Sequence, residues 1–336
     1  MATTTNISAN DMLSSYALFN ATDIKQFIID QLKTGNSVFK DADYLGSNIN
    51  AFIDIIAVML QQILFSYSVN ASETSFSTAM LYENMSKIVS ILNYKAAGKQ
   101  TSILPVKITI NRPAGYEEVS DVVLPRFLTA NHNYQYVLPE DEIIHLNGNS
   151  TVVDTVMFQG AVHQSSMFTA VGDEFETIYL DDNYINSSSS FISDNFFTVF
   201  VDENGDGNWK RYEETATMFL ETSIAEKYEK RFTEDSGYEF KFGNGTYGKK
   251  LPEGAKIIIY YLISNGEVGI VGSNIFTTNK ISLYASSEYN GISSTVADAR
   301  TTTIVPFEWL TIQNSGPSTA ISYPETVESI RKNAHK

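Results

Sequence analysis

Hydrophobic residues recur with a helical period in the N-terminal part of the chain. The segment TDIKQFIIDQL places Ile24 and Phe27 on one face, and Thr22 at its start is the expected N-cap. The segment 81–92 also has its apolar residues on one face, and this helix is expected to end near Gly98. Both segments are therefore predicted to form amphipathic helices.

Between them lies a more apolar helix, predicted over 48–67 with Ser47 as its N-cap. Its apolar positions form a stripe wider than one short neighbouring helix would cover. The polar residues at 50, 54, 61 and 62 interrupt the segment, so we expect no transmembrane helix. Periodicity leaves two roles open, the core of its own domain or a seam between chains. In the second case the candidate partner-binding residues are Phe52, Ile53, Ile56, Leu60, Ile63 and Leu64.

After residue 100 the period of the apolar positions changes to two. Runs such as SILPVKITINR, FETIYL, FFTVFV and AKIIIYYLI are separated by clusters of Gly, Asn, Asp and Ser, which is typical of strands joined by turns. We therefore predict an α+β protein, with an N-terminal helical region followed by β-rich, sandwich-like modules. The expected parts are a helical assembly region (1–99), a first β-rich module (100–190), a second β-rich module (191–272), and a β-rich or linker region that ends in the start of a helix (273–336).

Composition and charge narrow the functional classes. The chain has no cysteine, which excludes disulfides and thiolate metal sites. Its net charge is −16 and no basic stripe is visible, which argues against a nucleic-acid partner or an anionic membrane surface. The N-terminal segment MATTTNISANDM lacks both a basic and an apolar region of the kind a signal peptide needs, so we expect an intracellular product.

One segment, VDENGDGNWKRYEE, has the letters of a calcium loop. Six of its residues fall on EF-hand positions 1, 3, 5, 6, 7 and 12, namely Asp202, Asn204, Asp206, Gly207, Asn208 and Glu213. An EF-hand needs a helix on each side, whereas the flanking residues here are β-branched and aromatic. Residues tolerant of positive φ suit a hairpin connection, so we predict a metal-free hairpin over 202–208. A calcium site confined to the loop is the alternative.

A second segment, FGNGTYG, spells the dinucleotide fingerprint GxGxxG. That fingerprint requires a following helix, whose N-terminus would meet the pyrophosphate, but a turn and a strand follow here. We interpret the segment as a folding device, in which glycines adopt positive φ before the chain turns into the strand AKIIIYYLI. The structural turn residues are Gly243, Gly245, Gly248, Pro252 and Gly254.

Residues for catalysis do not form a recognisable pattern. The histidines, His132, His145, His163 and His335, lack metal-ligand spacing, and no GxSxG motif is present. Adjacent carboxylates such as Asp181-Asp182 lie in loop-like sequence, where solvated charge explains them. We therefore expect no enzyme, no catalytic or metal-binding residues and no cofactor.

Read in order, several segments resemble the baseplate J-like family of phage tail proteins. They are LNYK at 92–95 after the helices, FGNGTYG with PEG and YYL at 242–262, and PETVESIRKNA at 324–334. The similarity covers residues 20–336 in conserved order and is greatest to the wedge subunit that forms the inner ring of T-even-type contractile-tail baseplates.

The resemblance implies a structural subunit that scaffolds the baseplate ring and its rearrangement on tail contraction. Its implied partners are a second copy of itself, other wedge subunits bound through the N-terminal helices, and neighbouring wedges around a central hub. It also implies assembly in the host cytoplasm and a place in the virion, and it favours the seam role for the helix 48–67. In the family further domains follow PETVESIRKNA, whereas this sequence stops at Lys336. It is either a fragment of a longer protein or a version that lacks the C-terminal part, so the resemblance does not imply the ring contacts made by that part.

A host-facing tail protein that binds or cleaves carbohydrate is the alternative function. An aromatic content of 12% and tyrosine-rich loops such as NHNYQY are compatible with it. This alternative predicts exposed aromatic side chains around a site, or paired carboxylates at glycosidase separation.

Overall fold

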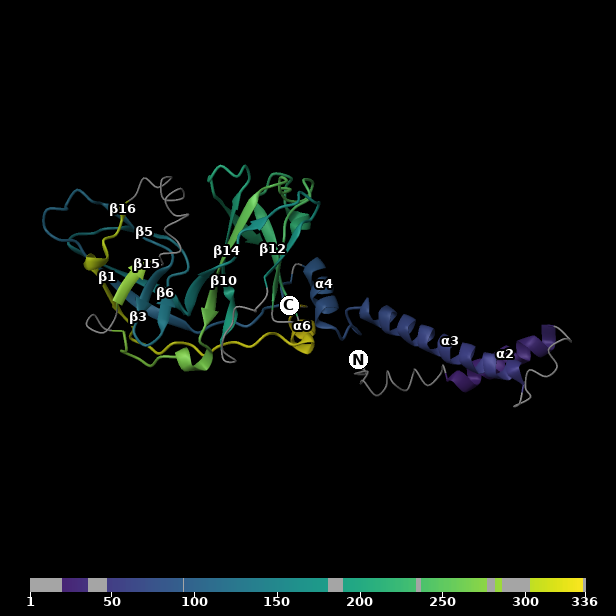
Figure 1. Cartoon of the computed structure of the whole chain (residues 1–336). Helices are drawn as coiled ribbons and strands as arrows, with labels where there is room; N and C mark the ends of the chain where they lie inside the picture. The colour runs from purple at the N-terminus through teal and green to yellow at the C-terminus, as the bar shows by residue number, and fades with distance from the viewer. Residues whose placement is uncertain are drawn as a thin grey trace, which may run out of the picture. The chain divides into compact units, whose positions relative to one another are not determined.

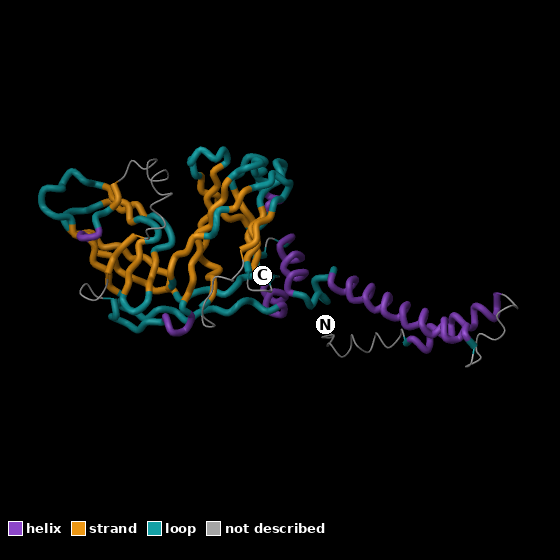
Figure 2. Tube along the Cα trace, in the orientation of Figure 1, coloured by secondary structure: helices purple, strands orange, loops and turns teal. Residues whose placement is uncertain are grey.

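A computed structural model describes residues 20–35, 47–92, 94–180, 190–233, 237–276, 282–285 and 303–334. The chain divides into two compact units, Met1–Ile88 and Val89–Lys336. The first unit contains helices and the second is rich in strands, as Figure 2 shows by colour. The predicted α+β class, with helices preceding sandwich-like β structure, is thereby confirmed.

Two helices pack together in the first unit (Figure 1). They are α2 (Ala21–Gly35) and α3 (Asn48–Glu73). Their contact is a small apolar core in which Ile29 of α2 and Ile53 of α3 are buried. The predicted cap Ser47 is confirmed, since its Oγ accepts the N–H of Ile49 at 3.2 Å. The predicted cap Thr22 is wrong, because Asn20 Oδ1 accepts the N–H of Thr22 and the helix begins earlier.

The end of α3 is connected to α4 (Tyr82–Ile91) through one carboxylate. Glu73 accepts the backbone N–H groups of Met80 and Leu81 at 2.9 and 3.0 Å, and the amide of Asn84 at 3.2 Å. Burial alone would raise the pKa of Glu73, but these donors hold it below its ordinary value. Glu73 thus joins the end of α3 to the two residues that precede α4 and to Asn84 in the first turn of α4.

The described strands of the second unit form three sheets. A six-stranded sheet has the order β15-β3-β4-β6-β1-β17. Its strands are β1 (Ile103–Asn111), β3 (Leu128–Asn131), β4 (Gln135–Val137), β6 (Ser150–Gln159), β15 (Ser282–Ala285) and β17 (Leu310–Gln313). A three-stranded sheet joins β16 (Thr303–Ile304), β2 (Asp121–Leu124) and β5 (Glu142–His145). The core between them holds Leu104, Ile108, Tyr136 and Trp309.

The largest sheet is eight-stranded, with the order β7-β14-β10-β11-β12-β13-β9 and β8 beside β14. Its strands are β7 (Ala161–Gln164), β8 (Phe168–Thr169), β9 (Thr177–Leu180), β10 (Phe191–Asp202), β11 (Lys210–Thr215), β12 (Lys227–Phe232), β13 (Tyr238–Lys241) and β14 (Lys256–Ser264). All neighbours are antiparallel except β11 and β12. Burial along β14 is nearly continuous, as expected of a strand covered on both faces.

Strand pairing crosses the ranges expected from the sequence. Strands β7, β8 and β9 come from the range 100–190 but pair within the eight-stranded sheet, while β15 and β17 come from 273–336 and pair with β3 and β1. A shared apolar cluster joins the two larger sheets, with Phe127 and Val137 on one side and Phe200 and Tyr260 on the other. These long-range pairings leave no trace in local periodicity.

A buried polar network also joins the two larger sheets. Gln159, at the end of β6, has no exposed surface. Its Oε1 accepts a hydrogen bond of 2.7 Å from the Ser264 hydroxyl. Thr101 Oγ1 donates to the Gln159 backbone oxygen at 2.6 Å and lies 2.8 Å from Ser264 Oγ. Because these buried groups have partners, the junction avoids the desolvation cost of unsatisfied polar atoms.

Candidate partner-binding site

Helix α3 exposes an extensive apolar surface. Four of the predicted partner-binding residues are solvent exposed, Phe52 at 65%, Ile56 at 46%, Leu60 at 37% and Ile63 at 62% of their surface, and Leu64 is half-buried. Neighbouring exposed residues extend this surface, namely Ile55, Val58, Met59, Phe65 and Tyr67. Exposed apolar patches of this kind mark interaction sites in soluble proteins. We call this set of exposed α3 residues the α3 stripe.

Ile53 does not belong to the α3 stripe. Only 3% of its surface is exposed, because it packs against Ile29 of α2 within the same unit. The prediction that Ile53 faces a partner is therefore corrected: it is a core residue of the helix pair. The two faces of α3 are thus distinct: one is covered by α2, and the other is exposed in the part of the chain that the structure describes.

By length and composition alone, α3 is also long and apolar enough to cross a membrane. Polar side chains lie along the same helix, and one of them forms an ion pair, Asp54 with Lys25 of α2 at 2.6 Å. A charged pair in the hydrocarbon core of a bilayer is costly. We therefore keep the prediction that α3 meets protein rather than lipid.

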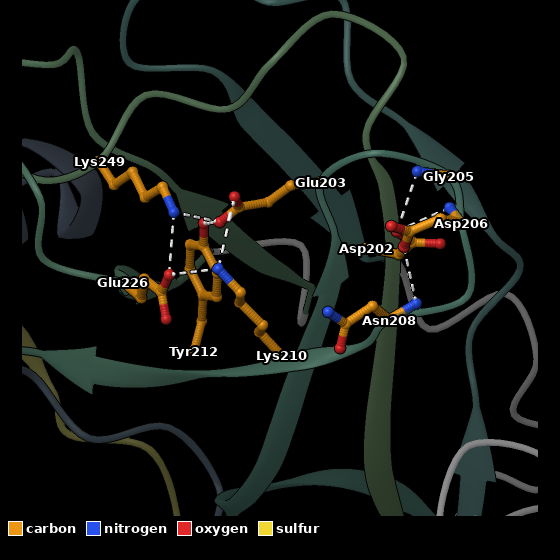
Figure 3. A network of polar contacts seen from close by, with 9 residues as sticks. All are labelled: Asp202, Glu203, Gly205, Asp206, Asn208, Lys210, Tyr212, Glu226 and Lys249. Carbon is orange, nitrogen blue, oxygen red and sulfur yellow. Dashed lines mark hydrogen bonds and ion pairs between the residues drawn. The ribbon is translucent and has the colours of Figure 1, made fainter. Parts of the chain in front are cut away.

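The calcium-like segment connects two antiparallel strands, as predicted for a hairpin. Val199 to Val201 on β10 pair with Lys210 to Tyr212 on β11. Asp202 accepts the backbone N–H group of Gly205 at 2.9 Å (Figure 3). It also accepts the N–H group of Gly207 at 2.8 Å. Gly205 and Gly207 both have positive φ, at 68° and 85°. In the part of the chain that the structure describes, no group of His, Asp or Glu is arranged to hold a metal ion.

Behind this loop lies a compact network of charges (Figure 3). Glu226 lies 3.1 Å from Lys210 and 2.9 Å from Lys249, and Glu203 contacts both lysines. Tyr212 Oη donates to Glu203 at 3.0 Å. Burial opposes ionisation of Glu203, but Lys249 and Tyr212 together hold its pKa below the ordinary value. The network fixes the base of the hairpin and makes its acidic residues structural.

The glycine signature forms a tight loop after β13. Gly245 and Gly248 have positive φ, at 88° and 71°, and the N–H of Gly245 donates to the Gly248 oxygen at 3.0 Å. Pro252 and Gly254 lie in the turn before β14, where Gly254 has a φ of 85°. The chain therefore leaves this loop as a strand, not as the helix that a dinucleotide site needs.

Position 243 requires glycine because of a close backbone contact, and not because of the positive φ predicted from the sequence. Its φ is not in the left-handed region, so the expectation of positive φ there is wrong. A Cβ on Gly243 would lie 2.1 Å from the backbone carbon of Gly248. The two glycines are in backbone contact, and no side chain fits between them.

Exposed aromatic side chains gather around this signature loop. The rings of Phe219 and Tyr247 meet edge to face, with their centroids 5.5 Å apart. The ring centroids of Phe219 and Phe175 are 6.0 Å apart. The ammonium of Lys241 lies over the rings of Phe175 and Phe219, at 4.4 and 5.4 Å. Phe175 has a φ of 54°, which is uncommon for a bulky residue. The sequence interpretation missed this cluster, whose residues come from three separate segments.

The first and last segments of the resemblance meet in the second unit. Tyr94 Oη donates to Glu325 at 2.8 Å, and the N–H of Ala97 donates to the same carboxylate at 3.2 Å. Asn333, on the helix α6 (Val327–Asn333), reaches Glu325 at 3.0 Å. The exit of the N-terminal helices is thereby joined to α6.

The histidines that the structure describes serve different local roles. His145 Nδ1 lies 2.7 Å from Asp121 Oδ1 on the neighbouring strand. The ring of His163 stacks on that of Tyr261, with their centroids 6.1 Å apart. His132 lies 6.5 Å from Phe276. His335 and the pair Asp181-Asp182 lie outside the described residues. The described histidines do not converge on one site.

Comparison with known proteins gives no family. No model of a known protein family matches the chain, and no curated protein matches it.

Proposed function

We propose that this chain is a structural subunit of a phage contractile-tail baseplate wedge, which scaffolds the inner ring and its rearrangement when the tail contracts. Its partners are a second copy of the chain, other wedge subunits bound through the N-terminal helices, and neighbouring wedges around a central hub. It acts without catalysis, cofactor, nucleic acid or membrane, and it is assembled in the host cytoplasm before it becomes part of the virion.

The uncovered α3 stripe is the observation that carries this proposal. The helix buries one face against α2 and leaves large apolar side chains such as Phe52 and Ile63 in solvent. Full burial of such a side chain is worth about 1.5–3 kcal/mol, so a partner that covers several of them gains a large driving force. A subunit of an assembly needs a surface of this kind.

The β unit supports a mechanical role. Its two larger sheets share an apolar cluster and the buried network around Gln159, so they form a stiff body. Assemblies that switch shape commonly do so by rotating stiff subunits about their interfaces. The link from Tyr94 to Glu325 would transmit such a rotation from the helix exit to α6.

The gene neighbourhood tests the class of the protein. The proposal expects genes for a tail sheath, a tail tube and further wedge subunits beside this gene. A neighbourhood of metabolic or secretion genes, with no tail genes, would contradict it.

A carbohydrate-binding tail protein is the second candidate, favoured by the aromatic cluster of Phe175, Phe219 and Tyr247. Exposed rings offer flat apolar faces with polar groups nearby, and Phe219 is 58% exposed. A glycan array probed with the full chain and with Phe219→Ala separates the two functions. Saturable binding that is lost in Phe219→Ala favours the glycan function, whereas no binding above background favours the scaffold.

A further inference from the structure

A cavity of about 710 Å³ opens inside the second unit. It lies where β10 and β11 separate, because their pairing extends only from Val199 to Val201 on β10. The loop before β1 forms part of its wall through Lys95, and β12 contributes Lys230. Its volume is within the range of small-molecule pockets.

Two lysine side chains face one carboxylate in this cavity. Lys95 Nζ contacts Glu214 Oε1, and Lys230 Nζ lies 3.7 Å from Glu214 Oε2. Lys230 is also 3.0 Å from Asp194. The other charged side chains that line the cavity are Arg211, Glu213 and Glu140, and Arg211 is paired with Glu140.

The two lysines differ in how they are held. Lys230 is only 2% exposed and is fixed between Asp194 and the rings of Phe197 and Tyr238, whose centroids lie 4.7 and 5.7 Å away. Lys95 keeps 31% of its side chain exposed and lines the cavity, where a ligand would reach it. Burial also lowers the pKa of Lys230, although Asp194 opposes the change. Lys230 is therefore the enclosed amine of the two, and Lys95 is the accessible one.

Electrostatics favour the neutral form of the accessible amine. Burial and the neighbouring Lys230 ammonium lower the pKa of Lys95 to about 7, although Asp194 opposes the change. Contact with the Glu214 carboxylate favours the ammonium form of Lys95, as Asp194 does. Desolvation and a neighbouring cation are the two ways by which proteins activate a lysine as a nucleophile.

We propose that Lys95 is a reactive amine that condenses with small aldehydes admitted to this cavity. The nitrogen of Lys95 attacks the carbonyl carbon, and the C=O bond is replaced by C=N. The carbonyl oxygen leaves as water with the two hydrogens of the neutral amine. No oxidant or reductant takes part, and Glu214 is placed to relay the proton between nitrogen and oxygen. This inference does not depend on the proposed function.

Reductive labelling tests the proposal. The full chain is treated with propanal and sodium cyanoborohydride, which traps the imine, and the modification of each lysine is followed by peptide mass spectrometry. The reference is Lys250, which is exposed in the same unit. At pH 7 an amine of pKa about 7 is roughly half neutral, whereas an ordinary lysine is less than about 0.1% neutral.

We expect Lys95 to be labelled at least about tenfold faster than Lys250 at pH 7. The larger neutral fraction of Lys95 speeds its labelling, and partial burial and lower basicity reduce this advantage. Its rate should level off above about pH 8, as expected of an amine with a pKa of about 7. In Glu214→Gln, loss of the carboxylate that favours the ammonium should increase labelling of Lys95 at pH 6 several-fold. Labelling of Lys95 no faster than Lys250, with parallel pH profiles, would overturn the proposal whether or not the variant folds.

Discussion

Tyr94 and Glu325, 231 positions apart, are joined by a hydrogen bond of 2.8 Å from the phenol to the carboxylate. The same carboxylate accepts Ala97 N–H and Asn333 Nδ2. Burial and the adjacent carboxylate both raise the pKa of Tyr94, so the phenol remains the donor. One side chain thus holds the helix exit, the loop before β1 and α6 together.

Replacing this carboxylate should destabilise the second unit. We expect Glu325→Ala to lower the free energy of unfolding in urea by about 2–3 kcal/mol, because hydrogen bonds to a charged group are strong and its donors lose their partner. Tyr94→Phe should cost about 1 kcal/mol. The matched control is Tyr323→Phe. Tyr323 donates to Glu267 at the surface, so this substitution should hardly change the free energy of unfolding. Equal costs for the two Tyr→Phe variants would contradict this account.

The glycine loop gives a prediction that separates close contact from backbone conformation. Gly243→Ala places a methyl group into the Gly248 backbone and should cost about 3 kcal/mol or more. In Gly245→Ala the added methyl group would make only an ordinary contact, 3.7 Å from Lys250 Cβ, but φ is positive, so the variant should cost about 1–2 kcal/mol. Gly272→Ala, which has neither restriction, serves as the control. Thermal unfolding measures the melting temperatures of the three variants. A larger loss of stability in Gly245→Ala than in Gly243→Ala would contradict the close contact between Gly243 and Gly248.

Helix period was enough to predict that α2, α3 and α4 exist, and strand period was enough for β1, β10 and β14. Two helix ends were wrong, because α4 ends at Ile91 and not near Gly98, and α3 continues beyond Tyr67 to Glu73. Strand β12 was missed, because KYEKRF is largely charged and only the fold shows that Lys230 is buried beside Asp194. The α3 stripe was predicted in part. Which side of α3 is covered by α2, and hence the different roles of Ile53 and Ile56, depends on packing that a periodic pattern does not specify.

The hairpin carboxylate should make stability depend on acid pH. Burial opposes ionisation of Asp202, but the N–H groups of Gly207, Gly205 and Asp206 lower its pKa in the folded state. A lowered folded pKa contributes stability that is present above the unfolded pKa, about 3.9, and is lost as pH falls through the folded value. Asp202→Asn should therefore cost about 1 kcal/mol at pH 7 and less at pH 3. Urea unfolding at both pH values measures the difference, and a cost independent of pH is the contrary result.

The same loop should not respond to calcium. Both Asp202 oxygens are already engaged by backbone N–H groups, so chelator and millimolar calcium should leave the melting temperature unchanged. Differential scanning calorimetry is the measurement, with magnesium as the control ion. A rise of several degrees that is specific to calcium would show preferential binding to the folded state and would overturn the hairpin interpretation.

The central claim is that the α3 stripe is a seam between chains, and one pair of variants tests it. Ile56 is exposed on the stripe, whereas Ile53, three residues away, is buried against Ile29. A buried unpaired carboxylate is costly, so Ile53→Asp should separate α2 from α3 and reduce the helical circular dichroism. Ile56→Asp should leave that signal and the melt of the β unit unchanged.

Sedimentation velocity of the wild type, Ile53→Asp and Ile56→Asp measures the claim directly. The account predicts that the wild type sediments as a dimer or larger assembly and that Ile56→Asp sediments as a folded monomer. A wild type that remains monomeric and binds no other wedge subunit, or an Ile56→Asp variant that assembles as the wild type does, would contradict it.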